Sequence, residues 1–142
     1  MGRSTLYLAG PLFNPGERDY NLRIRAVLEA HFDVYLPQVD GALLPELIRS
    51  GVSPERAAIR IFEEDVAAVR RCSQFLIVLN GRAVDEGAAF ELGLAWSLGK
   101  PTYGFKDDFR QAVAGGDNPM VERALIKVFR SLHALQEWVS TL

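Results

Sequence analysis

Short apolar runs alternate with longer amphipathic stretches along the chain. The short runs are rich in branched and aromatic side chains, as buried strands are, and predict strands at residues 5–9, 32–36, 75–80, 102–105 and 126–129. Between them, apolar residues recur every three or four positions, which predicts helices at about residues 17–31, 53–72, 85–98 and 131–139. Strands and helices that alternate in this way form a parallel sheet covered on both faces, so we expect a doubly wound α/β fold of about five strands.

Turn and cap signals set several of these boundaries. Gly10-Pro11 ends the first strand, Ser53-Pro54 starts a helix, and Gly99 has the position of a helix C-cap glycine. Residues 38–51 fit either a short helix or a mobile cover over a site, and the pattern leaves both open. Residues 106–119 are polar and contain glycine, so we interpret them as a loop, with a crossing to a neighbouring subunit as one option.

Two acidic residues interrupt apolar helix faces. The helical neighbours of Glu91 are mostly small: Gly87, Ala88, Leu94 and Ala95. Asp65 lies in the middle of another inner face, made of Ala58, Ile61, Phe62, Ala68 and Val69. A carboxylate on such a face is costly unless it is paired, hydrogen-bonded or functional. We therefore treat Glu91 and Asp65 as candidate site residues.

Further candidates gather at one edge of the predicted sheet, since doubly wound folds bind ligands where the parallel strands end. Tyr7 and the loop with Gly10, Pro11 and Phe13 belong to the first strand, and Asp85 has an N-cap position after the third. Neither the Gly-x-Gly-x-x-Gly pattern of dinucleotide sites nor the phosphate-loop pattern with its lysine follows the first strand. We expect no cofactor.

Composition narrows the class of protein. The 142 residues are 49% hydrophobic and 24% charged, which is ordinary for one globular domain spanning residues 1–142. A net charge of −2 offers no basic footprint for nucleic acid or an anionic membrane. With one cysteine, no signal peptide and no apolar run of spanning length, the sequence favours a cytoplasmic location. Two distant histidines and a single cysteine make a metal site improbable.

Several of these residues carry a resemblance to the nucleoside 2-deoxyribosyltransferase family over nearly the whole chain. The supporting segments are Leu6-Tyr7-Leu8-Ala9-Gly10-Pro11, the helix with Asp65, Asp85-x-Gly87-x-x-x-Glu91-x-Gly93-x-Ala95, Gly99-Lys100 and Asn118-Pro119-Met120. The resemblance implies a flavodoxin-like subunit that exchanges the base of a 2'-deoxynucleoside, as in nucleotide salvage. Its substrates would be small-molecule 2'-deoxynucleosides and free nucleobases.

The resemblance also implies a role for each matched residue. Glu91 would be the nucleophile that forms a covalent deoxyribosyl intermediate, and the hydroxyl of Tyr7 would orient it. Asp65 would deliver a proton near the base, and Asp85 would lie near the sugar hydroxyls. Asn118, with Met120 beside it, would be lent by a neighbouring subunit to the 5' side of the sugar. A homo-oligomer would therefore complete the site, with Gly10, Pro11, Phe13 and Gly87 also against the substrate.

The chemistry suits these groups independently. Breaking an N-glycosidic bond builds positive charge on the sugar ring, which an anionic carboxylate stabilises and can trap. The departing base needs a proton, which a second acid supplies. A glutamate with its ordinary pKa of about 4.3 is ionised at neutral pH, unless burial raises that pKa strongly. Water must be kept out if a second base is the acceptor, a role for Phe13 or residues 38–51.

Structural roles remain as alternatives for each residue taken alone. Glu91 fits an exposed helix position on a misassigned face, Asp85 a simple helix cap, and Tyr7 a core residue. Asp65 fits an ion pair with Arg18 or Arg60, and Asn118 a turn residue before proline.

Two other functions compete with base exchange. A 2'-deoxynucleoside 5'-phosphate N-hydrolase would use the same glutamate, pass the sugar to water and hold a 5'-phosphate. Such hydrolases have a Ser-x-Arg-Gly-Gly type first loop, whereas this chain has Gly10-Pro11-Leu12-Phe13, although Arg18 and Arg23 keep this alternative open. A non-catalytic nucleotide-sensing module on the same fold is the third hypothesis.

Overall fold

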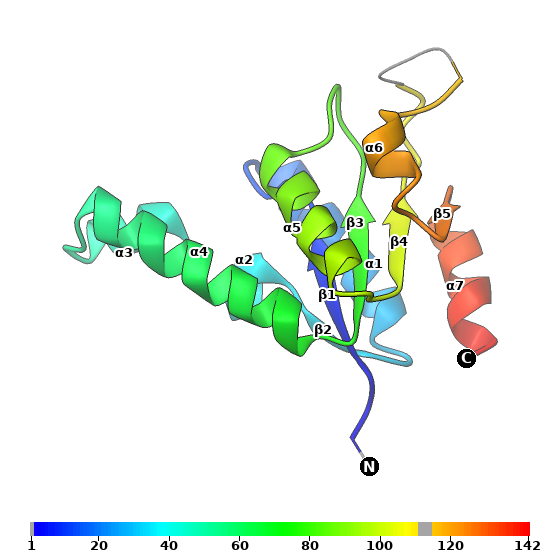
Figure 1. Ribbon diagram of the computed structural model, residues 1–142, viewed down its shortest axis with the longest axis horizontal. Helices are drawn as coiled ribbons and strands as arrows, with labels where there is room; N and C mark the ends of the chain where they lie inside the picture. The colour runs from blue at the N-terminus through cyan, green and yellow to red at the C-terminus, as the bar shows by residue number, and fades with distance from the viewer. Residues whose placement is uncertain (1, 111–114) are drawn as a thin grey trace.

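The computed structural model describes residues 2–110 and 115–142, which form a parallel sheet with helices around it (Figure 1). The five strands are β1 (Thr5–Ala9), β2 (Asp33–Tyr35), β3 (Gln74–Val78), β4 (Thr102–Phe105) and β5 (Lys127–Phe129). They lie in the order β2-β1-β3-β4-β5, and every neighbouring pair is parallel. The strand order changes direction between β1 and β3, so the switch point lies at the carboxyl ends of these two strands.

Helices cover both faces of this sheet. They are α1 (Pro15–Leu28), α2 (Pro37–Asp40), α3 (Leu44–Arg49), α4 (Pro54–Arg71), α5 (Glu86–Ser97), α6 (Pro119–Glu122) and α7 (Leu132–Ser140). On one face, Leu6 packs in a buried cluster with Ile24 of α1 and Leu135 of α7. On the other, Tyr7 packs in a second cluster with Ala88 of α5. A parallel sheet with helices packed on both faces confirms the doubly wound α/β prediction.

Most predicted boundaries are confirmed to within a few residues. The first helix begins earlier than expected, at Pro15, because the side chain of Asn14 accepts a hydrogen bond from the backbone N–H of Glu17 at 2.9 Å. Ser53 caps α4 as predicted, accepting from Arg56 N at 3.3 Å. Gly99 has a φ of 72°, the left-handed conformation that a helix C-cap glycine supplies.

The two segments without a firm prediction are now defined in part. Residues 38–51 contain the end of α2 and all of α3, so the short-helix option is confirmed for Leu44–Arg49, and the role as a cover over the site stays a prediction. In the expected loop at residues 106–119, residues 107–110 have no helix or strand and α6 begins at Pro119. Residues 111–114, and the crossing to a neighbouring subunit expected for this loop, lie outside the described residues.

The predicted inner face of α4 is wrong in its first half. Phe62 is 57% exposed and its ring contacts that of Phe90 on α5, with 5.8 Å between the ring centres. Figure 1 shows the reason, since α4 extends away from the sheet and only its last turns lie beside the strands. Ala68 and Val69, near its end, are buried as expected. No helix in the described part of the chain is both long and apolar enough to cross a membrane.

Candidate functional site

Tyr7 and Glu91 meet near the carboxyl ends of the strands. Tyr7 lies in β1 with its side chain fully buried on the face that α5 covers. Its hydroxyl donates a hydrogen bond to Glu91 Oε2. Glu91 is half-buried in the second turn of α5, beside the buried stripe formed by Ala88, Leu92 and Ala95. The structure therefore excludes the exposed helix-surface alternative for Glu91.

The start of α5 determines where Glu91 lies. Asp85 is the N-cap residue, as predicted, and its carboxylate accepts a hydrogen bond from Ala88 N at 2.9 Å. This bond satisfies one of the free N–H groups of the first turn. Gly87 is exposed, and the nearest atom to a side chain built there would be Asp85 Oδ2, at 3.3 Å. A side chain at residue 87 would therefore crowd the carboxylate of the N-cap residue.

Glu91 holds its proton more tightly than the sequence alone indicates. Burial raises its pKa to about 8, and the negative charges of Asp65 and Asp85 add to this rise. The hydrogen bond from Tyr7 acts in the opposite direction, because it stabilises the carboxylate. Burial outweighs the hydrogen bond, so Glu91 is not ionised as a glutamate with an ordinary pKa would be. In the unliganded protein the Glu91 carboxyl group is mostly protonated at neutral pH.

Asp65 faces the same site from α4. Burial raises its pKa to about 6, and the neighbouring charge of Glu64 contributes. The predicted structural alternative, an ion pair with Arg18 or Arg60, is wrong. Arg60 instead binds Glu64 at 2.9 Å, and Arg18 donates to the carbonyl of Leu12 at 3.1 Å. A carboxyl group with a pKa near neutrality is able both to release and to accept a proton at physiological pH.

The loop after β1 is held by close packing. A side chain at Gly10 would lie 2.9 Å from Val78 Cβ, so only glycine allows β1 and β3 to approach this closely at their ends. The carbonyl of Pro11 accepts a hydrogen bond from the buried side chain of Asn21 at 2.9 Å. Phe13 is 73% exposed, and its backbone N–H donates to Glu17. The loop is therefore fixed at its base, and Phe13 lies in solvent.

Asn118 and Met120 lie at the start of α6. Asn118 caps this helix, accepting from Met120 N at 2.9 Å, and Met120 is 84% exposed. The turn that carries them is anchored from inside by Lys106, whose ammonium group lies 2.7 Å from the carboxylate of Asp117. Both of these charged side chains are more than nine-tenths buried. Asn118 and Met120 thus project outward from a rigid base.

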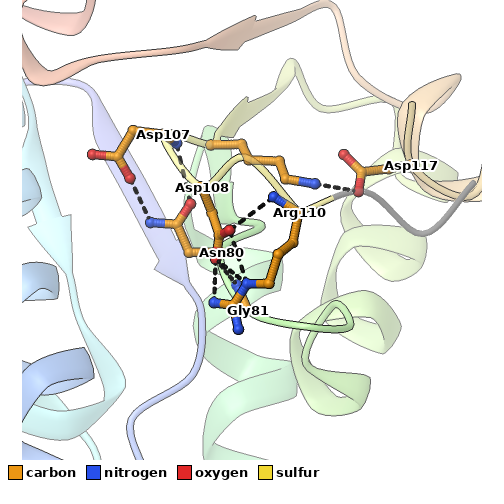
Figure 2. Close-up of polar contacts among 7 residues, drawn as sticks. Asn80, Gly81, Asp107, Asp108, Arg110 and Asp117 are labelled. Carbon is orange, nitrogen blue, oxygen red and sulfur yellow. Dashed lines mark hydrogen bonds and ion pairs between the residues drawn. The ribbon is translucent and has the colours of Figure 1, made fainter. Parts of the chain in front are cut away.

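A polar network joins this region to the loop before α5 (Figure 2). Asn80, after β3, donates to Asp107 at 2.7 Å and accepts from its backbone N–H at 3.1 Å. Gly81 N donates to Asp108 at 3.0 Å, and the guanidinium of Arg110 also binds Asp108. The network links the segments that follow β3 and β4, and it therefore steadies the loop that leads to Asp85.

Two pockets open near the carboxyl ends of the strands. One of about 640 Å³ lies on the α4 side and includes Tyr35, Gly41, Glu64 and Arg71 in its lining, and therefore adjoins Asp65. The other, of about 290 Å³, lies on the α1 side between Asn14 and Arg110. Among the residues that the structure describes, no group of three or more His, Cys, Asp or Glu side chains is arranged to hold a metal ion.

The sequence missed Tyr35 and the buried pair of Lys106 and Asp117. Tyr35 was predicted only as part of a strand, although the alternation in residues 32–36 places it and Val34 on opposite faces. Its register opposite Tyr7 depends on how β1 and β2 pair, which no local pattern reveals. The two charges of the buried pair lie in a segment that reads as a polar loop, and nothing local indicates their burial.

Fold and site together define a flavodoxin-like α/β protein with a cluster of partly buried carboxylates at the switch point of its sheet. A family model described as nucleoside 2-deoxyribosyltransferase matches residues 6–127, and the chain belongs to this family of enzymes. A search of curated proteins finds no match.

Solved structures share the fold. A 2-deoxyribosyltransferase from Bacillus psychrosaccharolyticus is 24% identical, with a TM-score of 0.75 over 94% of this chain and 90% of that one. A 2-desoxiribosyltransferase from Leishmania mexicana is also 24% identical, with a TM-score of 0.67 over 96% and 97%. A CMP N-glycosidase from Clostridium botulinum is 14% identical, with a TM-score of 0.56 over 96% and 99%. At these identities the likeness concerns the fold.

Proposed function

We propose that this protein transfers the 2-deoxyribosyl group between nucleobases of 2'-deoxynucleosides, in nucleotide salvage, with purines among the bases and in the cytoplasm. The observation that carries the proposal is the hydrogen bond from Tyr7 to a half-buried Glu91 at the switch point of the sheet. It occurs in a chain that matches the deoxyribosyltransferase family over residues 6–127. No cofactor takes part in the proposed reaction.

In the first half-reaction, the carboxylate of Glu91 attacks the anomeric carbon of the sugar. Tyr7 holds Oε2, which leaves the other oxygen free to form the new C–O bond. The C–N bond to the base breaks, and its electron pair leaves with the base. Asp65, with a pKa of about 6, supplies the proton that the leaving base needs. The product is a deoxyribosyl ester of Glu91 and a free nucleobase.

In the second half-reaction, a nitrogen of the acceptor base attacks the anomeric carbon and displaces Glu91. The proton lost by that nitrogen returns to Asp65, and Glu91 becomes a carboxylate again. Each half-reaction inverts the configuration at the anomeric carbon, so the overall transfer proceeds with retention. Asp85 holds the sugar hydroxyls, and its role as a helix cap is compatible with this because a carboxylate has two oxygens.

Water must stay out of the ester intermediate, and residues 38–51 are suited to this task. A side chain at Gly41 would lie 3.6 Å from Asp65 Oδ1, so this segment borders the proposed base side of the site. Phe13, which is 73% exposed, would have to fold over the sugar after substrate binds. Together with Gly10, Pro11 and Gly87 it would form the wall around the substrate.

A second copy of the chain would complete the site. Asn118 and the 84% exposed Met120 project outward, as residues lent to a neighbour would. The exposed rings of Phe62 and Phe90, which touch each other on α4 and α5, offer an apolar surface suited to contact between subunits. Analytical ultracentrifugation should find a homo-oligomer, and a Phe62→Glu variant should weaken it. A monomeric active enzyme would contradict this part of the proposal.

The direct test supplies deoxyinosine and free adenine to the purified protein, with chromatography of the products. Base exchange predicts equal amounts of deoxyadenosine and hypoxanthine, and a pyrimidine acceptor in a parallel reaction defines the range of bases. Glu91→Gln should lose at least a thousandfold in rate, because the nucleophile is gone. Glu86→Gln, an exposed change on the first turn of the same helix, is the matched control and should exchange bases normally. Wild-type activity in Glu91→Gln would refute the mechanism.

Hydrolysis of 2'-deoxynucleoside 5'-phosphates is the second candidate. Arg18 favours it, because its guanidinium binds the carbonyl of Leu12 and so places a cation on the loop beside the site. If this candidate is right, deoxynucleoside 5'-monophosphates should give free base and deoxyribose 5-phosphate, and added adenine should give no new nucleoside. Tight binding of nucleotides without any reaction would indicate a sensing module instead.

A further inference from the structure

Three aromatic rings stand in a row on the face of the sheet that carries the site. Tyr35 of β2, Tyr7 of β1 and Phe75 of β3 occupy matched positions in the strand register. Matched residues of neighbouring parallel strands point to the same face. The ring of Tyr7 lies 5.3 Å from that of Tyr35 at 22°, and 5.6 Å from that of Phe75 at 6°. Tyr7 is therefore clamped between two stacked rings.

The two outer rings of this row differ in their support. Phe75 is fully buried in the core between β1 and β4. Tyr35 belongs to the edge strand β2, is only half-buried, and lines the 640 Å³ pocket on the α4 side. One face of its ring thus supports Tyr7 while the rest of the side chain borders open space. If Tyr35 were lost, the Tyr7 phenol would be free to tilt towards that pocket.

The hydroxyl of Tyr35 lies close to Gly41, on the side of the site where Asp65 would transfer protons. A side chain built at Gly41 would lie 2.9 Å from Tyr35 Oη, 3.0 Å from the carbonyl of Pro37 and 3.6 Å from Asp65 Oδ1. A glycine is therefore needed for this approach. Burial of the phenol, and after it the negative charges of Asp65, Glu64 and Asp40, raise the pKa of Tyr35 to about 12, against an opposing effect of Arg71. Tyr35 accordingly remains a neutral, protonated phenol.

We propose that Tyr35 is a positioning residue that holds the hydroxyl of Tyr7 on Glu91 by stacking against the Tyr7 ring. The groups that act on the Glu91 carboxyl are Tyr7 from β1, Asp65 from α4 and Asp85 from the start of α5. The two aspartates oppose a negative charge on Glu91, and Tyr7 stabilises it. Burial has the largest effect on the ionisation of Glu91, and the hydrogen bond from Tyr7 opposes it, so the angle of the phenol ring affects how readily Glu91 ionises. Tyr35, on one side of that ring, helps to hold the angle.

The test follows the ionisation of Glu91 directly, by carbon-13 NMR titration of the side-chain carboxyl in the unliganded protein. Tyr35→Leu removes the stacked ring and should raise the midpoint of the Glu91 titration by about one pH unit. Tyr7→Phe, which removes the hydroxyl itself, should give a similar rise. Below that midpoint the rate constant kcat/KM should fall about tenfold, because a tenth as much Glu91 is ionised. Tyr35→Phe keeps the ring and should keep the midpoint. Tyr20→Leu, an aromatic loss on the opposite face, is the matched control.

A double variant separates positioning from general damage. In a Tyr7→Phe background, Tyr35→Leu should produce no further shift, since the hydroxyl that it positions is already absent. An equal shift in both backgrounds, or none in wild type, would overturn the proposal. Tyr35→Met, whose unbranched side chain adapts more easily to the space left by the ring, replaces Tyr35→Leu if circular dichroism shows that the latter is unfolded.

The kinetic consequence rests on the proposed function, and the titration does not. A shifted midpoint in a protein that lacks transfer activity would uphold the positioning role and reject the transferase. Transfer activity together with an unshifted midpoint would do the reverse.

Discussion

The hydroxyl of Tyr7 donates a hydrogen bond to the carboxylate of Glu91 and so joins the central strand β1 to the helix α5. One partner comes from a buried strand and the other from a helix on the same face of the sheet, far along the chain. Burial raises the pKa of Glu91, and this hydrogen bond lowers it, so the contact makes the carboxyl group easier to ionise. Its effect on acidity leads to the first two predictions.

The rate of base exchange should pass through a maximum near pH 7. The reaction needs Glu91, with its pKa raised to about 8, to be ionised while Asp65, with its pKa raised to about 6, is protonated, so kcat/KM for deoxyinosine should fall below pH 6 and above pH 8. Tyr7→Phe removes the hydrogen bond that lowers the pKa of Glu91, so the maximum should move to higher pH. Initial rates from pH 5 to 10 measure this shift. A rate that falls steadily from pH 6 to pH 8 would show that Glu91 is already ionised.

The free energy of unfolding should fall as the pH rises between about 4.5 and 8. Over that range the folded protein keeps a proton on Glu91 that the unfolded chain has lost. The contribution of Glu91 to stability is fully present below the pKa of the unfolded chain, about 4.5, and is lost as the pH rises through the folded pKa of about 8. The expected slope reaches about 1.4 kcal/mol per pH unit for this group. Asp65, raised to about 6, acts in the same direction at lower pH.

Urea unfolding of wild type and Glu91→Gln at pH 5 and pH 8 measures this slope. Glutamine does not titrate, so the difference in stability between the two proteins should change with pH in favour of the variant at pH 8. A constant difference would contradict the buried, protonated state of Glu91.

Breaking the buried pair of Lys106 and Asp117 should destabilise the protein strongly. Lys106→Met leaves the carboxylate of Asp117 buried without its partner, which costs about 3–5 kcal/mol. The double variant Lys106→Met with Asp117→Leu removes both charges and should recover much of the loss. Urea unfolding gives these values, and Arg60→Met, which breaks the exposed pair with Glu64, should change stability by less than about 1 kcal/mol. Equal effects of the two single variants would count against a structural role for the buried pair.

Gly41→Ala should disturb the site through Tyr35. The new Cβ would lie 2.9 Å from Tyr35 Oη and 3.0 Å from the carbonyl of Pro37, so the Tyr35 side chain has to move. We expect a loss of about 1–3 kcal/mol in stability and a lower rate of base exchange. Gly93→Ala on α5 is the control, because nothing lies within 4 Å of its Cβ and alanine favours a helix by about 0.5–1 kcal/mol. Thermal unfolding of both variants measures the change in stability, and initial rates measure the change in base exchange.

The elements of this fold were predictable because their signals are local. Residues 75–80 predicted β3 from branched apolar side chains, and Ser53-Pro54 predicted the start of α4 from capping alone. Asp85 was predicted as an N-cap for the same reason. The roles of Glu91, Asp65, Tyr7 and Asn118 rest on the family resemblance and stay predictions, although the structure brings the first three of them into one site.

Other properties of the protein depend on contacts between distant segments, and only the tertiary structure decided them. The exposure of Phe62 follows from the extension of α4 beyond the sheet, which periodicity within the helix does not encode. The stacking of Tyr35 on Tyr7 follows from the register of two strands, and the burial of Lys106 and Asp117 from the packing of separate loops. The protonation of Glu91 also belongs here, because a pKa depends on the water and charges that the folded chain removes or brings near, whereas sequence patterns record neighbours along the chain.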